Sequence, residues 1–117
     1  MPTILIIDDE SSLVSSLSFA LEAEGYLVHG AATASAGLTA IGELQPDLVL
    51  LDLRLPDRTG LEVLEAMQPT NGGPQVIMIS AHGDTRAAVK AVKMGAADYL
   101  TKPFDLDDLL HTIHTVL

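Results

Sequence analysis

Two apolar runs of the sequence end in carboxylates that could do chemistry. Asp52 follows the apolar residues 48–51, and Asp8 and Asp9 follow the apolar residues 4–7. Continuous apolar runs of this length are typical of strands that are buried on both faces, as in a parallel sheet. Because parallel strands have their carboxyl ends at the same edge of the sheet, the three aspartates are expected to meet there. Ligands bind beyond this edge in such sheets.

Two further runs end in a hydroxyl and an ammonium group. Ser80 follows the apolar residues 76–79, and Lys102 follows the short segment 98–101. Two carboxylates about 4 Å apart repel each other by roughly 4 kcal/mol at an effective dielectric constant of about 20, so a cluster of three needs a cation. An acidic site with only oxygen ligands suits Mg²⁺, and Lys102 can offset more of the negative charge.

Carboxylates, Mg²⁺ and a lysine are groups that hold a phosphoryl group during its transfer. A carboxylate that is free to attack can itself become an aspartyl phosphate. Asp52 is the best candidate, because it stands alone at the end of a central strand while Asp8 and Asp9 can share the metal. The hydroxyl of Ser80 could then donate a hydrogen bond to a phosphoryl oxygen.

The segments that must position these residues alternate between strand-like and helix-like patterns. We expect strands at residues 3–7, 26–31, 48–51, 76–79 and 98–101, and helices at residues 13–24, 35–44, 61–67, 85–94 and 106–117. Strict alternation predicts an α/β fold, a doubly wound and flavodoxin-like five-stranded parallel sheet with helices on both faces. Its common strand order is 2-1-3-4-5, and the switch point between the first and third strands would gather the three aspartates.

Local signals predict how some of these elements begin, pack or end. Ser11 and Ser12 can cap the first helix, and Val89 and Val92 are expected on the inner face of the fourth helix. The sequence Asn-Gly-Gly-Pro at residues 71–74 is typical of a turn. The second strand is more polar than the others, so we expect it at an edge of the sheet.

Composition limits the class of protein. The 117 residues fit one domain that spans residues 1–117. Six basic residues against sixteen acidic ones give a net charge of -10, which disfavours direct binding of nucleic acid by this domain. There is no cysteine, no apolar run near the ~20 residues that cross a bilayer, and no secretory signal pattern at the start. We therefore expect a cytoplasmic domain without thiolate chemistry or a membrane segment.

In this order and at strand ends, the polar residues resemble the receiver domain of two-component response regulators. The resemblance covers essentially the whole chain. It rests on four motifs, which are Asp8-Asp9, Asp52 followed by Pro56 and Gly60, Ser80-Ala81, and Lys102-Pro103-Phe104. Residues 80–84, 88–89 and 95–96 look most like receivers of enhancer-binding transcriptional activators.

The resemblance implies which residues hold the metal and the phosphoryl group. Asp52 would be the phosphoacceptor. Asp8 and Asp9 would bind Mg²⁺ together with Asp52 and the backbone carbonyl of Arg54. Lys102 would contact the phosphoryl group.

The resemblance also implies a switch and its partners. Ser80 would be the switch hydroxyl and Tyr99 the switch aromatic, with a cis peptide bond before Pro103. A histidine kinase or a phosphotransfer protein would supply the phosphoryl group, and the domain would catalyse only its own phosphorylation and dephosphorylation. The face made by the fourth helix, the fifth strand and the fifth helix would control homodimerisation or an output domain, which we expect to lie outside this chain.

Two positions depart from the family pattern. Thr59 stands before Gly60, where many members have an acidic residue. Arg54 occupies a position that tends to tune the lifetime of the phosphoryl group, which leaves that lifetime open.

Other functions are possible for the same residues. A phosphatase of the aspartyl-phosphate class usually has a second acid two residues after its nucleophile, and Arg54 occupies that position here. A flavodoxin-like cofactor binder needs hydroxyls and backbone donors after the first strand, where Asp8-Asp9-Glu10 would repel a phosphate. A receiver-like scaffold that is never phosphorylated is disfavoured by the intact acidic set.

Several side chains also have plainer interpretations. Asp8 and Asp9 could be charges that favour the N-terminus of the first helix, and Ser80 could be a helix cap. Tyr99 could be a packed aromatic of an edge strand. The four histidines are expected at the surface, and the pair formed by residues 111 and 114 lacks a third metal ligand nearby in the sequence.

Overall fold

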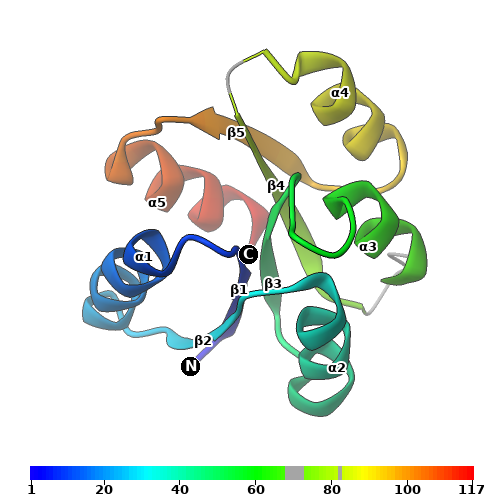
Figure 1. Ribbon diagram of the computed structural model, residues 1–117. Coiled ribbons are helices and arrows are strands. Elements are labelled where there is room, and N and C mark those ends of the chain that lie inside the picture. The colour runs from blue at the N-terminus through cyan, green and yellow to red at the C-terminus, as the bar shows by residue number, and fades with distance from the viewer. Residues whose placement is uncertain (68–72, 82) are drawn as a thin grey trace.

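Five strands and five helices alternate along the chain (Figure 1). The structure, a computed structural model, describes residues 1–67, 73–81 and 83–117. The strands are β1 (Thr3–Ile7), β2 (Leu27–Ala31), β3 (Leu48–Asp52), β4 (Gln75–Ala81) and β5 (Asp98–Lys102). The helices are α1 (Ser11–Ala23), α2 (Ala34–Leu44), α3 (Gly60–Met67), α4 (Thr85–Lys93) and α5 (Leu106–Val116). These are the predicted elements, with small shifts at their ends.

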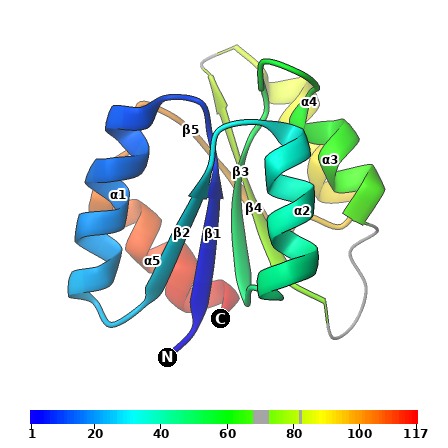
Figure 2. The same cartoon turned by 60° about the horizontal axis from the view of Figure 1, so that its bottom comes forward.

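All five strands lie parallel in one sheet with the order β2-β1-β3-β4-β5, as predicted. The register pairs Asp52 of β3 with Ile79 of β4, and Ala81 of β4 with Lys102 of β5. The carboxyl ends of the strands therefore reach the same edge of the sheet, where the chain turns into the helices (Figure 2). This edge carries the polar residues that the sequence analysis singled out.

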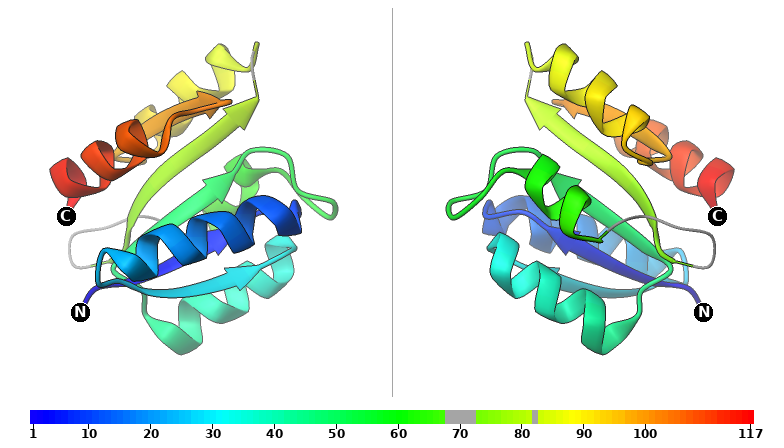
Figure 3. Two further views of the ribbon diagram at one scale, coloured as in Figure 1. Left: turned by 90° about the vertical axis from the view of Figure 1, so that its left-hand side faces the viewer. Right: turned by 90° about the vertical axis from the view of Figure 1, so that its right-hand side faces the viewer.

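The helices cover the sheet in two layers. α1 and α5 lie against one face, and α2, α3 and α4 lie against the other (Figures 1 and 3). Because side chains alternate along a strand, Ile4 and Ile6 pack with α1 and α5, whereas Leu5 and Ile7 pack with the other three helices. β3 is buried along its whole length, since it lies between β1 and β4 and has helices on both sides.

The two edge strands are less buried than the central ones. β2 lies beside β1 at one edge, as predicted, and it exposes His29 and Gly30. β5 forms the other edge, where Tyr99 and Leu100 are half-buried. Within the described residues, no helix has both the length and the apolar character that crossing a membrane would require.

The predicted serine cap of α1 is wrong. The helix already includes Ser11 and Ser12, and Glu10 occupies the N-cap position without a capping hydrogen bond from its side chain. A side chain must stand before the first turn to accept from its backbone N–H groups, so both serines come too late to cap this helix.

The predicted inner face of α4 is wrong by one residue. Val89 and Val92 are each 42% exposed, while Ala88 and Ala91 are buried against the sheet. Both pairs have the same helical spacing, and the smaller alanines allow the helix to pack closely on the sheet. Of the turn predicted at residues 71–74, the first two residues lie outside the described part of the chain.

Candidate functional site

Three carboxylates meet at the carboxyl edge of the sheet. Asp8 and Asp9 follow β1, and Asp52 ends the neighbouring strand β3. One oxygen atom from each carboxylate lies within 4.8 Å of the other two. Asp8 is 2% exposed and Asp52 is 7% exposed, whereas Asp9 faces solvent. The structure therefore brings the three aspartates singled out from the sequence into one cluster.

The carboxylate of Asp52 is held in an environment that disfavours its charge. Burial is the main cause that raises its pKa from 3.8 to about 6, and the charge of Asp8 is the next. Lys102 and the backbone N–H of Arg54, which donates to Asp52 Oδ1 over 3.4 Å, oppose this rise. A cation bound among the carboxylates would relieve their repulsion, so the donor set fits a hard divalent ion such as Mg²⁺.

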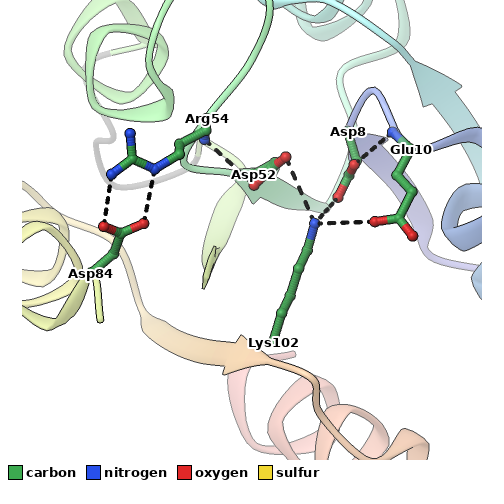
Figure 4. Close-up of polar contacts among 6 residues, drawn as sticks. All are labelled: Asp8, Glu10, Asp52, Arg54, Asp84 and Lys102. Carbon is green, nitrogen blue, oxygen red and sulfur yellow. Dashed lines mark hydrogen bonds and ion pairs between the residues drawn. The ribbon is translucent and has the colours of Figure 1, made fainter. Parts of the chain in front are cut away.

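Lys102 from the end of β5 reaches into the same cluster (Figure 4). Its Nζ atom lies 2.9 Å from Asp8 Oδ2, 3.7 Å from Asp52 Oδ2 and 3.9 Å from Glu10 Oε1. Burial by itself would lower the pKa of Lys102, but the hydrogen bond to Asp8 and the nearby negative charges outweigh burial and raise it. The ammonium group is therefore charged and turned toward the two buried carboxylates.

A glycine lets the segment after β3 return close to Asp52. α3 begins at Gly60, whose backbone N–H donates to the carbonyl of Leu53 over 2.6 Å. A Cβ atom on Gly60 would collide with the carbonyl oxygen of Asp52 and lie 3.0 Å from the Cα of Leu53. The first turn of α3 therefore rests directly on the backbone that carries the central carboxylate.

The other predicted site residues lie on β4 and β5. Ser80 is buried, and it follows Ile79, the residue of β4 that pairs with Asp52. Tyr99 is half-buried and packs against the apolar cluster that includes Ala91 of α4. The peptide bond between Lys102 and Pro103 is cis.

An ion pair beside the cluster was not found from the sequence. The Nε and Nη2 atoms of Arg54 donate to Asp84 Oδ2 and Oδ1 over 3.1 and 2.9 Å (Figure 4). These hydrogen bonds lower the pKa of Asp84. Asp84 occupies the N-cap position of α4 but makes no capping hydrogen bond with its side chain. An acid just before a helix is typical of an N-cap, so the sequence can single out Asp84 but cannot predict that it pairs with Arg54.

A second missed contact ties the segment after β3 to α2. The carboxylate of Asp57 accepts hydrogen bonds from the backbone N–H groups of Ala34 and Ser35 over 2.8 and 3.0 Å, and from Ser35 Oγ over 3.0 Å. The two backbone hydrogen bonds are the main causes that lower the pKa of Asp57 to about 2. Because 22 to 23 residues separate the partners, no local pattern reveals this cap.

The histidine pair of α5 lines a small pocket at the surface. His111 and His114 are exposed, and they line a small pocket of about 180 Å³ with Glu24 and Leu110. Among the described residues, only the three clustered aspartates bring three ligand atoms close enough for one metal ion. His82 lies outside the described part of the chain.

Comparison with known proteins gives the family. Residues 4–114 match the family model described as the response regulator receiver domain. The chain belongs to this family. Receiver domains are the signalling switches of two-component systems, so the family predicted from the motifs is confirmed.

The receiver domain is similar to regulators over nearly its whole length. It is 36% identical over 111 residues to the photosynthetic apparatus regulatory protein RegA of Rhodobacter capsulatus, a match that covers 95% of this chain and 60% of RegA. It is 42% identical over 110 residues to the transcriptional regulatory protein KdpE of Mycobacterium tuberculosis, covering 94% of this chain and 48% of KdpE. The DNA-binding transcriptional regulator NtrC of Proteus hauseri is 39% identical over 112 residues, covering 96% of this chain and 24% of NtrC.

The receiver domain therefore spans between 24% and 60% of the length of these three relatives. NtrC is of the enhancer-binding type that the sequence resembles, and it is one of several kinds of regulator among the relatives.

Solved structures share the fold. The TM-score is 0.91 with a CheY-like receiver domain protein of Methanospirillum hungatei, at 36% identity and covering 98% of this chain and 92% of that one. It is 0.90 with the receiver domain of NtrX from Brucella abortus, at 34% identity and covering 97% of each chain.

Proposed function

We propose that this receiver domain takes a phosphoryl group onto Asp52 from a phosphorylated histidine of a histidine kinase or a phosphotransfer protein. The observation that supports this most is the position of the Lys102 ammonium group, 2.9 Å from Asp8 and 3.7 Å from Asp52. A lysine placed there can attract phosphoryl oxygens toward Asp52 and offset the charge that the group brings.

The proposed transfer needs only the phosphorylated histidine and the Asp52 carboxylate as reactants. An oxygen of ionised Asp52 attacks the phosphorus atom, the P–N bond to the donor histidine breaks, and its electron pair stays on the imidazole nitrogen. Asp52 is mostly ionised above its pKa of about 6, so the attacking form is present at neutral pH. Attack of water on the aspartyl phosphate releases inorganic phosphate and restores the carboxylate.

Asp8, Asp9 and Asp52, with the backbone carbonyl of Arg54, are the groups that would hold Mg²⁺. They form an oxygen-only donor set in which two of the three carboxylates are buried, and their mutual repulsion favours a cation. When bound, Mg²⁺ would supply positive charge to the phosphoryl oxygens during transfer. This assignment is supported by the three carboxylates and the Lys102 ammonium group, which lie at the same edge of the sheet.

An apolar pocket next to Lys102 supports docking of the protein that donates the phosphoryl group. The pocket has a volume of about 390 Å³ and lies between α1 and the segment after β5. Its lining includes Leu13, Leu17, Phe104 and Leu106. An apolar side chain of the donor protein could enter it and bring the phosphorylated histidine next to Asp52.

We further propose that phosphorylation changes the face made by α4, β5 and α5. Ser80 would move toward the phosphoryl group, and Tyr99 would move inward from its half-buried position on β5. Such a change would bias a two-state surface that controls a second copy or an output domain.

The face made by α4, β5 and α5 carries both basic and acidic side chains, so two copies of it could pair. α4 carries Arg86, Lys90 and Lys93, which are half of the six basic residues of the chain. The first turn of α5 carries Asp107 and Asp108. In a two-fold dimer each surface meets its own copy, so the basic helix of one protomer would face the acidic turn of the other.

Mass spectrometry after incubation with acetyl phosphate and Mg²⁺ tests the proposed function. We expect the wild-type domain to gain the mass of one phosphoryl group, which hydroxylamine removes, and Asp52→Ala to gain none. Lys102→Ala should be phosphorylated much more slowly than the wild type, while Lys90→Ala, which removes a surface lysine of α4, should not. A phosphoryl group that still forms in Asp52→Ala would overturn the assignment of Asp52.

A further inference from the structure

One ion pair joins the two segments that flank Asp52. Among the described residues, the pair of Arg54 and Asp84 is the sole ion pair between the segment after β3 and the segment that leads into α4. Its two hydrogen bonds of 2.9 and 3.1 Å form a bidentate contact, which holds both groups in a defined geometry. Figure 4 shows the pair on the side of Asp52 opposite Lys102.

We propose that this ion pair is a latch, in which Asp84 holds the guanidinium of Arg54 away from Asp52 and holds the start of α4 in its unphosphorylated position. A phosphoryl group on Asp52 would compete for the same guanidinium and open the latch. The inference rests on the proposed phosphorylation of Asp52. It makes Asp84 a positioning residue that acts through Arg54.

The competition follows from the placement of the two anions around Arg54. Arg54 is two residues from Asp52, and its own backbone N–H already donates to the Asp52 carboxylate. A phosphoryl group carries a charge of about -2 at neutral pH and presents oxygens that a guanidinium can bind in bidentate fashion. The Arg54 side chain is 73% exposed, so it can turn from one anion to the other without repacking the core.

The side chain of Asp84 gives the latch its connection to α4. Only 16% of that side chain is exposed, so the carboxylate is held against the domain rather than free in solvent. Asp84 also stands directly before α4, and its carbonyl accepts the backbone hydrogen bond of Ala88. Release of the carboxylate from Arg54 therefore frees the first turn of the helix that carries the proposed switch face.

The expected effect of the latch is modest. Exposed ion pairs typically change an equilibrium by between about 1.4-fold and fivefold. A contact of this strength does not block phosphorylation, but it shifts the balance between the two states of the domain. Its removal should therefore change a lifetime or an apparent affinity by that factor, without changing whether Asp52 is modified.

Two readouts on four proteins test the latch. The wild type, Asp84→Asn, Arg54→Gln and the double variant are phosphorylated with acetyl phosphate and Mg²⁺, and the loss of the phosphoryl group is followed by mass spectrometry. The beryllofluoride concentration that half-saturates each protein is measured in parallel. Asp84→Glu, which keeps a carboxylate, and Glu65→Gln, which removes an exposed charge of α3, are the controls.

We expect Asp84→Asn to lengthen the phosphoryl lifetime and tighten beryllofluoride binding by between about 1.4-fold and fivefold. Arg54→Gln and the double variant should match each other, because Asp84 has no guanidinium to hold once Arg54 is gone. Asp84→Glu and Glu65→Gln should resemble the wild type.

Two outcomes would overturn the latch while leaving the proposed function in place. One is that Asp84→Asn equals the wild type in both readouts. The other is that its effect is equally large with and without Arg54. A wild type that gains no phosphoryl group would overturn the proposed function, and the latch with it.

Discussion

The carboxylate of Asp52 is buried beside the buried carboxylate of Asp8. The charge of Asp52 should therefore lower the thermal stability of the metal-free domain. Burial and the charge of Asp8 raise the pKa of Asp52, so neutralising Asp52 removes an unfavourable charge from the folded state. We expect Asp52→Asn to raise the Tm of the metal-free domain by a few degrees. Asp8 differs, because it accepts hydrogen bonds from Lys102 and from the backbone N–H of Glu10. Asp8→Asn should therefore not raise the Tm, although both residues are buried acids.

The response of the Tm to Mg²⁺ tests whether the three aspartates form the metal site. An ion that binds only the folded domain raises its stability, so millimolar Mg²⁺ should raise the Tm of the wild type. The rise should be smaller in Asp52→Asn and in Asp9→Asn, each of which lacks one carboxylate of the cluster. Calorimetric scans with and without Mg²⁺ provide both comparisons. An equal rise in all three proteins would place the ion somewhere else.

The carboxylate of Asp57 should make stability depend on pH in the acidic range. Its pKa is about 2 in the folded domain, below the usual 3.8, because backbone N–H groups of α2 donate to its charged form. A lowered pKa adds stability above the unfolded value, and this contribution is lost as the pH falls toward the folded value. The Tm difference between wild type and Asp57→Asn should therefore be steady from about pH 5 to about pH 7 and shrink below about pH 4.

The control for this pH series is Glu43→Gln, which removes an exposed acid from the last turn of α2. It tests whether the loss of any negative charge near α2 has the same effect. A Tm difference for Asp57→Asn that persists unchanged below about pH 4 would mean that the cap does not depend on the charge of Asp57.

At the scale of elements, two glycines should respond to alanine with opposite signs. A Cβ on Gly60 would collide with the backbone of Asp52 and Leu53, so Gly60→Ala must push α3 away from the site. We expect a loss of about 1–3 kcal/mol in the free energy of unfolding. Gly42 lies within α2, where a Cβ atom would meet only open space, and Gly42→Ala should gain about 0.5–1 kcal/mol. Urea unfolding measures both, and a stabilising Gly60→Ala would contradict the close approach.

The elements themselves were largely predictable, because their signals are local. Strands β1, β3 and β4 are continuous apolar runs, and strict alternation with helices predicts the parallel sheet, whose order is the common one for five doubly wound strands. The gathering of Asp8, Asp52 and Lys102 followed from the same rule, since all three stand at strand ends.

The contacts that were missed depend on distances between segments far apart in the sequence. Arg54 and Asp84 are 30 residues apart, so their pairing depends on how closely the ends of β3 and β4 approach. The exposed valines of α4 were assigned to the core because hydrophobicity and spacing favour them as strongly as the alanines beside them. What separates the two pairs is how closely α4 packs on the sheet, which no local pattern contains.

At the scale of the whole molecule, the proposed dimer can be tested by exchanging charges. Arg86→Glu with Lys90→Glu makes α4 acidic, and Asp107→Lys with Asp108→Lys makes the start of α5 basic. Each double variant should fail to self-associate with beryllofluoride, because like charges then face each other across the two-fold interface. An equal mixture of the two should associate, since opposite charges meet at both contacts. Analytical ultracentrifugation measures all three samples, and a mixture that stays monomeric would contradict this pairing.

The edge position of β5 has a consequence for how such a partner would be held. α4 and α5 lie on opposite sides of the sheet, and β5 is the rim between them (Figure 3). A protein that grips this rim touches both layers of helices at once, although the two layers have separate apolar interiors. It would therefore sense any sliding of one layer against the other, and a small shift of α4 alone would be enough to spoil or complete its fit.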